Sequence, residues 1–288
     1  MARSKPDTVS QLIRHLRDNL ESLRREMTAE ELTAHRRNLL NKEIQNIGRE
    51  IEELLREFDP IKSPSTMFDP SNPEHVGLFI ALALVAQSRI PLSEVGDFYG
   101  AGVYAIYYHG PNEAYAPISG KEVPIYVGKA DPANPTARTP KEQGTRLSGR
   151  LKDHSRSIRK AKTTLRMADF TCRFLVIQSG WQKSAETFLI NFFHPIWNTE
   201  TSICWGVGKH GDSAEMRSHP RSPWDTLHPG REWAQDSPED QVPEAEIRKN
   251  MAKHFKLAAD DGRLFSEMTD VLDAFVSGLK FSDLLSPK

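Results

Sequence analysis

The chain has 288 residues, of which 38% are hydrophobic and 27% are charged. This length suits one domain of ordinary size with extensions, and the composition is typical of a globular protein rather than a disordered one. The longest apolar run, residues 76–86, is far shorter than the roughly 20 residues of a membrane-spanning helix, and no apolar signal core follows Met1. We therefore expect a cytoplasmic protein without a membrane partner. The two cysteines, Cys172 and Cys204, are too few for a disulfide framework or a four-thiolate zinc site.

The first 58 residues predict two helices with a coiled-coil seam. Apolar residues step by 4, 3 and 4 from Leu16 to Met27, and by 4, 3, 4, 3 and 4 from Leu40 to Phe58. Between these runs, Thr28 followed by Glu31 matches a capping box, which predicts that the second helix begins there. We expect a helical hairpin that either packs on the rest of the protein or pairs with a second subunit.

The middle of the chain predicts an α+β fold, with a small antiparallel three-stranded sheet flanked by helices. Strands are predicted from β-branched and aromatic runs at residues 102–108, 124–128 and 170–178. Helices are predicted from apolar periodicity at residues 75–88, 146–162 and 184–193. Ser184 is the expected N-cap of the last of these helices.

Four segments follow from this pattern. They are an N-terminal helical extension at residues 1–59, a linker and packing helix at residues 60–98, a core with long loops at residues 99–240, and a C-terminal helical extension at residues 241–288. The last segment predicts two helices, and its role is open.

The formal net charge of −1 conceals one strongly basic segment. Residues 1–60 carry 11 Lys and Arg against 12 Asp and Glu, whereas residues 138–173 carry 11 against 3. A surface that binds a polyanion needs several cations that converge on phosphates and release counterions. The segment therefore indicates a nucleic-acid partner, and the alternative is a helix whose charges are only solvated.

Several polar residues of the core are candidates for chemistry. Arg150 and His154 are four residues apart on the basic helix and therefore share one face. Glu186 lies among apolar residues, where a carboxylate is costly unless it is paired or binds a metal. Tyr104 and Tyr126 lie in two of the predicted strands. Taken singly, such tyrosines usually belong to a core, and such an Arg/His pair is usually solvated.

In chain order these residues resemble a known family. The GIY-YIG nucleases share an order of motifs that here is Gly102-Val103-Tyr104, Tyr126-Val127-Gly128, Arg150, His154, Glu186 and Asn198. The surrounding sequence is similar to the type II restriction endonucleases of that superfamily whose described members cut the palindrome CCGCGG. These similar runs are Gly100–Tyr108, Pro124–Ala130, Pro195–Asn198 and His228–Ala234. Insertions at residues 108–123 and 131–145 depart from the family, so its DNA-contacting loops are not carried over.

The resemblance implies an enzyme that hydrolyses DNA with one Mg²⁺ per active site. Glu186 would be the metal ligand, because Mg²⁺ is usually held by one or two carboxylates, waters and phosphate. We expect no second carboxylate at this site, because Asp153 points away from the face of Arg150 and His154. Arg150 would clamp the scissile phosphate with its planar fork of donors.

The general base has two candidates. Tyr104 is preferred, although a tyrosine is only ~0.1% ionised at pH 7 and needs help from its neighbours. His154 is the alternative, because its ordinary pKa is near 6.5. Tyr126 and Asn198 would bind the phosphate or orient water and side chains.

The expected substrate is double-stranded DNA with a short GC-rich palindrome, cut to 5′-phosphate and 3′-hydroxyl ends. Expected partners are a second copy of the chain on the DNA and a cognate DNA methyltransferase as the functional counterpart. Further cations are expected to contact DNA: Lys129, Arg156, Arg159, Lys160, Lys162, Arg166, and Lys209 and His210 in a glycine-containing loop. The alternatives are a structure-selective repair or mobile-element nuclease with the same core, and a non-catalytic DNA-binding or coiled-coil protein.

Overall fold

The computed structural model describes residues 8–29, 33–58, 61, 68–198, 220–235, 237 and 239–279. They fall into two units: α1 (Thr8–Ala29) and α2 (Ala34–Phe58) belong to one, and the described residues from 68 to 279 form the other. No helix in these ranges is long and apolar enough to cross a membrane. Cys204, Lys209 and His210 lie outside the described residues.

The two N-terminal helices form where the seam predicts them, but their boundary differs. α1 continues through Thr28 to Ala29, so the capping box predicted at Thr28 is wrong. Instead, Thr33 precedes α2, and its Oγ1 accepts a hydrogen bond from the Arg36 N–H at 3.4 Å. The seam is exposed on both helices, for example at Leu20 (48%) and Ile47 (44%). What covers it therefore stays a prediction.

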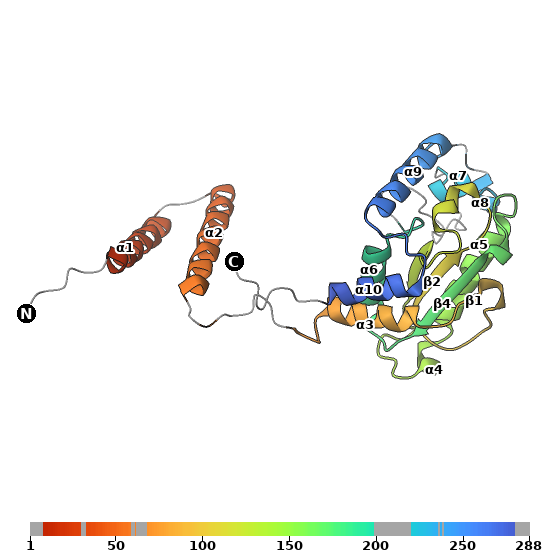
Figure 1. Ribbon diagram of the computed structural model, residues 1–288, viewed down its shortest axis with the longest axis horizontal. Coiled ribbons are helices and arrows are strands. Elements are labelled where there is room, and N and C mark those ends of the chain that lie inside the picture. Colours follow the sequence, from red (N-terminus) through yellow and green to blue (C-terminus); the bar gives the residue numbers. More distant parts are fainter. Residues whose placement is uncertain are drawn as a thin grey trace, which may run out of the picture. The chain divides into compact units, whose positions relative to one another are not determined.

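A four-stranded antiparallel sheet forms the centre of the second unit (Figure 1). Its order is β1 (Ile90–Pro91), β4 (Phe170–Val176), β2 (Gly102–Tyr108) and β3 (Tyr126–Ala130). Each of the three predicted runs overlaps a strand, although β3 begins and ends two residues later than predicted. The prediction of only three strands is wrong, because Ile90 and Pro91 pair with β4. Two residues that include a proline carry no alternating pattern, so the sequence gives no signal for this strand.

Two motif glycines are required by the packing of β2 between its neighbours. Tyr104 lies opposite Gly128 in the register of β2 and β3. A Cβ at Gly128 would lie 2.5 Å from Tyr104 Oη, so the tyrosine side chain can cross β3 only over a glycine. A Cβ at Gly102 would overlap the carbonyl oxygen of Leu175 in β4. These glycines therefore place Tyr104 at its position in the sheet.

Helices cover the sheet on both sides (Figure 1). α5 (Arg146–Lys160) packs on β2 and β3 and buries Leu147, Leu151 and Ile158, as predicted. α6 (Gln182–Phe193) also packs on these strands, and α3 (Pro73–Val85) packs on α6 and β4. α6 begins two residues before Ser184 with Trp181 at its N-cap, so the predicted cap is wrong and Glu186 lies in the second turn.

The C-terminal extension packs on the core. α9 (Glu244–Asp260) and α10 (Met268–Gly278) confirm the two helices predicted there. Phe275 of α10 is buried and stacks on Phe192 of α6, with ring centroids 4.2 Å apart. The helix that carries Glu186 is therefore supported by the end of the chain. The shorter elements are α4 (Pro140–Gln143), α7 (Pro223–Leu227), α8 (Glu232–Gln235), η1 (Leu92–Glu94), η2 (Glu113–Ile118) and η3 (Met167–Asp169).

Candidate active site

Three aromatic side chains from β2, β3 and α5 meet at one end of the sheet. The Tyr104 hydroxyl is 2.7 Å from His154 Nε2, and both residues are buried. The Tyr126 ring lies over the same histidine, with centroids 4.6 Å apart, and 6.1 Å from the Tyr104 ring. The helical spacing that places Arg150 and His154 on one face therefore delivers His154 to the tyrosine of the first motif.

Burial sets the protonation states of this group. Burial, followed by the neighbouring Tyr126, raises the pKa of Tyr104 well above its ordinary value. Burial also lowers the pKa of His154 to about 3, with the charges of Arg150 and Arg231 acting in the same direction. His154 is therefore neutral, and a neutral imidazole can accept the Tyr104 proton at Nε2. Its Nδ1 is buried without a hydrogen-bond partner in the described part of the chain.

Of these three rings, that of Tyr126 lines a cavity of about 790 Å³, whereas Tyr104 and His154 do not line it. The acidic residues that line this cavity are Glu186, Asp131 and Asp153. The cationic residues that line it are Lys129, Arg146 and Arg150. The expectation that Glu186 is the only carboxylate at this site is therefore wrong. Asp131 lies in a loop with no periodicity and did not stand out in the sequence. Asp153 was expected to point away from Arg150, but it lines the same cavity.

Glu186 has the environment of a cation ligand. Burial raises its pKa, Asp131 raises it further, and the charges of Lys129 and Arg150 oppose both effects. A partly buried carboxylate beside another carboxylate is stabilised when a cation binds between or near them. Among the described residues no group of three or more His, Cys, Asp or Glu side chains is arranged to hold a metal. A metal ion bound by Glu186 would therefore need water or phosphate oxygens as further ligands.

Arg150 faces the whole cluster. Burial raises the pKa values of Tyr104 and Tyr126, and the charge of Arg150 opposes this rise. The same charge lowers the pKa values of His154 and Glu186. In the described ranges no carboxylate forms a salt bridge with Arg150, so its guanidinium remains available to an anion in the cavity.

Asn198 is placed by the main chain of β3. Its Oδ1 accepts a hydrogen bond from the Val127 N–H at 2.7 Å, and its Nδ2 donates to the Val127 carbonyl at 2.6 Å. The neighbouring Trp197 N–H donates to the Ile125 carbonyl. Asn198 thus fixes the strand that carries Tyr126, which fits the predicted orienting role and leaves the predicted phosphate contact without support in this geometry.

A buried network that the sequence did not indicate supports Trp197. The Tyr115 hydroxyl is 2.5 Å from His228 Nε2 and accepts a hydrogen bond from Trp197 Nε1 at 3.0 Å. His228 Nδ1 is 2.9 Å from Thr164 Oγ1. Burial lowers the pKa of His228 to about 3, with a smaller contribution from Arg248. Because Tyr115 and His228 are 113 residues apart, no local pattern could connect them.

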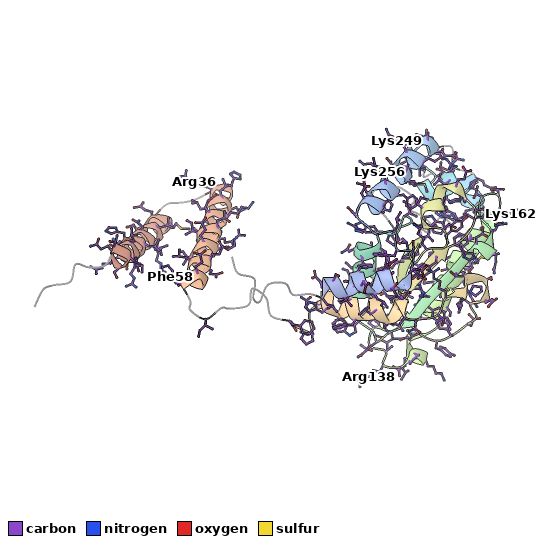
Figure 2. The ribbon with its side chains drawn as sticks, in the orientation of Figure 1. Arg36, Phe58, Arg138, Lys162, Lys249 and Lys256 are labelled. Carbon is purple, nitrogen blue, oxygen red and sulfur yellow. The ribbon has the colours of Figure 1, made fainter. Side chains whose placement is uncertain are left out.

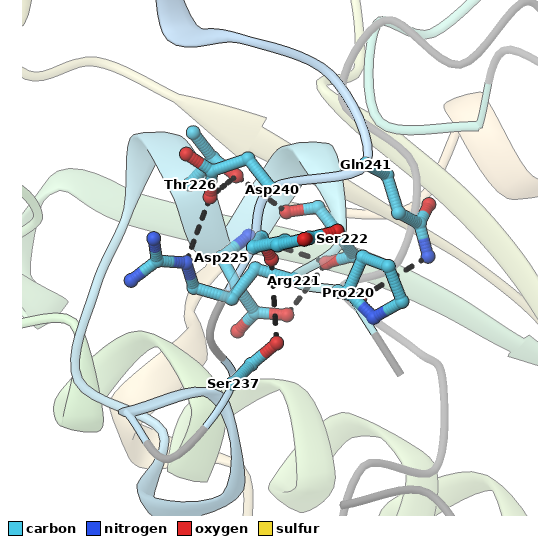
Figure 3. Close-up of polar contacts among 9 residues, drawn as sticks. Pro220, Arg221, Ser222, Asp225, Thr226, Ser237, Asp240 and Gln241 are labelled. Atoms are coloured by element: carbon cyan, nitrogen blue, oxygen red, sulfur yellow. Dashed lines mark hydrogen bonds and ion pairs between the residues drawn. The ribbon is translucent and has the colours of Figure 1, made fainter. Parts of the chain in front are cut away.

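A second buried feature in this region is the ion pair of Asp225 and Arg231. Arg231 Nε and Nη2 donate to the Asp225 carboxylate at 2.6 and 2.5 Å, and Ser222 Oγ donates to the same group at 2.5 Å. Figure 3 shows the contact of Ser222 with Asp225, next to Asp240, which accepts hydrogen bonds from Arg221 and Thr226. The charge of Arg231 contributes to the low pKa of His154, after burial and the charge of Arg150, and no sequence motif indicated this contribution.

The cations expected to bind DNA differ in their surroundings. Four already have carboxylate partners: Lys129 with Asp131, Arg156 with Asp153, Lys160 with Glu232 and Arg166 with Asp169. Arg159 and Lys162 are exposed without an ion pair among the described residues, and Lys162 projects from the surface (Figure 2). Arg159 follows Arg150 by about two and a half helical turns, so it lies on the opposite side of α5. The predicted contact of Arg159 with DNA would therefore need a phosphate on the side of α5 opposite to the one that Arg150 binds.

Comparison with known families agrees with this geometry. The model of the Eco29kI GIY-YIG domain matches residues 96–255, more than half of the chain, and this range contains all six of the motif positions Tyr104, Tyr126, Arg150, His154, Glu186 and Asn198. None of the curated proteins compared with the chain matches it. The chain therefore belongs to the family of the Eco29kI GIY-YIG domain, whose members are type II restriction endonucleases, that is, site-specific deoxyribonucleases acting on DNA.

Proposed function

We propose that this restriction endonuclease uses Mg²⁺ to cut both strands of DNA at a short GC-rich palindrome, leaving 5′-phosphate and 3′-hydroxyl ends. The observation that carries the proposal is the 2.7 Å contact of Tyr104 with His154, next to a cavity that contains Glu186 and Arg150. The resemblance of the motif-flanking runs to endonucleases that cut CCGCGG supports a GC-rich site.

Glu186 would hold the single Mg²⁺ of each active site. Its partly buried carboxylate has a raised pKa, which a bound cation would lower, and Mg²⁺ retains several waters when it has few protein ligands. When bound, the ion would supply positive charge beside the scissile phosphate and the departing 3′ oxygen. Arg150 would donate to the same phosphate, and Tyr126 would orient it from the cavity wall.

Tyr104 would be the general base, with His154 as its proton acceptor. The attacking water would pass a proton to Tyr104 Oη as Tyr104 passes its own proton to His154 Nε2. Direct action of His154 on water is less favoured, because its Nε2 already contacts the Tyr104 hydroxyl. Phosphate binding to Arg150 would also offset one of the charges that lower the pKa of His154.

The substrate duplex would also contact cations outside the catalytic group. We propose Lys129 at the cavity, Arg156 and Lys160 farther along α5, and Lys162 and Arg166 beyond the end of that helix. Those of these cations that form a salt bridge with a carboxylate would contact a phosphate instead when DNA binds. Because a palindrome has a two-fold axis and each chain has one active site, two chains would act together on the DNA. A cognate methyltransferase would protect the host's own sites.

Digestion of a long DNA of known sequence, followed by sequencing of the ends, tests the proposal. We expect Mg²⁺-dependent breaks at one palindromic sequence with 5′-phosphate ends. Breaks confined to branched or flapped DNA would indicate a structure-selective nuclease instead. DNA binding without breaks, under any divalent ion, would indicate a non-catalytic DNA-binding protein.

A further inference from the structure

Arg146 is a cation of the cavity that none of the family motifs contains. It is the first residue of α5, it is exposed, and it lines the cavity together with Arg150. The two arginines are four residues apart, which places them about 40° apart around the helix and about 6 Å apart along it. They therefore present two guanidinium groups to the same space.

The other charges around the cavity largely compensate each other. Lys129 contacts Asp131, and Asp153 contacts Arg156. Arg146 and Arg150, by contrast, form no salt bridge within the described ranges, and of the acidic lining residues only Glu186 forms none there. Glu186 instead accepts a hydrogen bond from the main chain at Lys129. If Glu186 binds a metal ion, the two arginines are the positive charge that remains for the substrate.

We propose that Arg146 binds the DNA phosphate next to the one that Arg150 clamps. This inference rests on the proposed function, because it takes DNA as the occupant of the cavity and Arg150 as the clamp of the scissile phosphate. Successive phosphates of one strand follow each other at a spacing comparable to one helical turn, so two arginines on one helix face can bind two of them. A guanidinium suits this task because its fork of donors matches phosphate oxygens.

The role of Arg146 is binding rather than chemistry. Its phosphate keeps the same charge throughout the reaction, so its contact stabilises the bound substrate and the transition state equally. Loss of the contact should therefore raise KM and leave kcat nearly unchanged. Loss of Arg150 should lower kcat, because charge develops on the phosphate that Arg150 holds.

Arg159 provides a matched control on the same helix. It is also exposed and also cationic, but it lies on the side of α5 opposite to Arg150. A helix-wide electrostatic effect would be the same for Arg146→Ala and Arg159→Ala, whereas a specific phosphate contact is lost only in Arg146→Ala.

The test measures binding of a fluorescent DNA duplex of arbitrary sequence, in EDTA, over a series of salt concentrations. We expect Arg146→Ala to reduce the slope of log K against log salt by about 0.9, Arg159→Ala to leave it unchanged, and Arg146→Lys to restore it. In cleavage assays with Mg²⁺, Arg146→Ala should raise KM roughly tenfold at similar kcat. Melting temperatures of all variants should match the parent, since both side chains are exposed.

Two outcomes would overturn the inference: a parental salt slope for Arg146→Ala, or equal losses for Arg146→Ala and Arg159→Ala. Either result in a protein that still cleaves a palindrome would leave the proposed function intact and remove only the role of Arg146. A parent protein that neither binds duplex DNA nor cleaves it would remove both.

Discussion

The substitution Tyr104→Phe removes one oxygen atom from the centre of the active site and leaves the ring that packs over Gly128 of β3. In the parent, the hydroxyl is 2.7 Å from His154 Nε2, and His154 Nδ1 has no partner in the described part of the chain. The variant therefore leaves a buried imidazole with neither nitrogen bonded. Leaving a buried polar group unsatisfied costs about 1–3 kcal/mol of the free energy of unfolding.

The expected effect on catalysis is larger. Loss of a general base lowers turnover by about 10²- to 10⁴-fold, which corresponds to about 3–5 kcal/mol in the activation barrier. A domain stable by about 5–15 kcal/mol tolerates the smaller loss and stays folded. The two quantities can therefore be separated by measuring urea unfolding and single-turnover cleavage with Mg²⁺ on the same preparation.

Tyr108→Phe is the matched control for this experiment. Tyr108 is also a buried residue of β2, and its hydroxyl accepts a hydrogen bond from the Asn112 N–H at 2.9 Å. Its loss should destabilise the protein to a similar degree without changing turnover. If Tyr108→Phe slows cleavage as much as Tyr104→Phe, the effect is structural. If Tyr104→Phe cleaves at the parental rate while His154→Ala is inactive, His154 is the base and the roles must be exchanged.

Four further expectations concern the metal, acid stability and assembly. Glu186→Gln should abolish cleavage and retain duplex binding in gel-shift assays. The control variant Asp153→Asn should still cleave. Cleavage by Glu186→Gln at ordinary Mg²⁺ would show that Glu186 is not the metal ligand. His228 has a pKa of about 3, below the ordinary value near 6.5, so its contribution to stability is complete above about pH 6.5 and is lost as the pH falls toward 3. Between pH 7 and pH 5 the parent should lose about 2 kcal/mol more than His228→Gln in urea unfolding, and equal losses would contradict the buried neutral state. In an α1/α2 hairpin, Leu16 would lie opposite Ile47, because α1 ends at Ala29 and α2 begins at Ala34. Cysteines at these two positions should therefore crosslink within one chain on a non-reducing gel, whereas a crosslinked dimer would show pairing between subunits. Light scattering should find two chains on a single-site duplex, and a 1:1 complex that breaks both strands would exclude the dimer.

Local patterns predicted much of the core. The run from Gly102 to Tyr108 gave a central strand because β-branched and aromatic residues fit a sheet that is covered on both faces. The apolar steps at Leu147, Leu151 and Ile158 gave α5 its orientation, and that orientation brings His154 to Tyr104. These predictions succeeded because one helix face or one strand determines them.

Features that depend on contacts between distant segments were missed. The acidic lining of the cavity includes Asp131, which reaches it from an irregular loop. Asn198 was predicted to orient neighbouring groups, but its hydrogen bonds to the main chain of β3 were not. The contact of His228 with Tyr115 was missed altogether. The cap at Ser184 failed because α6 begins earlier, at a tryptophan that offers no side-chain hydrogen bond and therefore no capping signal.

The stacking of Phe275 on α6 has a consequence for how far the catalytic unit extends. The family match ends at residue 255, whereas Phe275 lies beyond it and contacts Phe188, Phe192 and Phe193, which lie within it. A protein cut at residue 255 would expose these rings to water on the helix that carries Glu186. Sequence similarity and cooperative folding therefore have different boundaries in this chain. A transplant of the catalytic module into another protein should include α10.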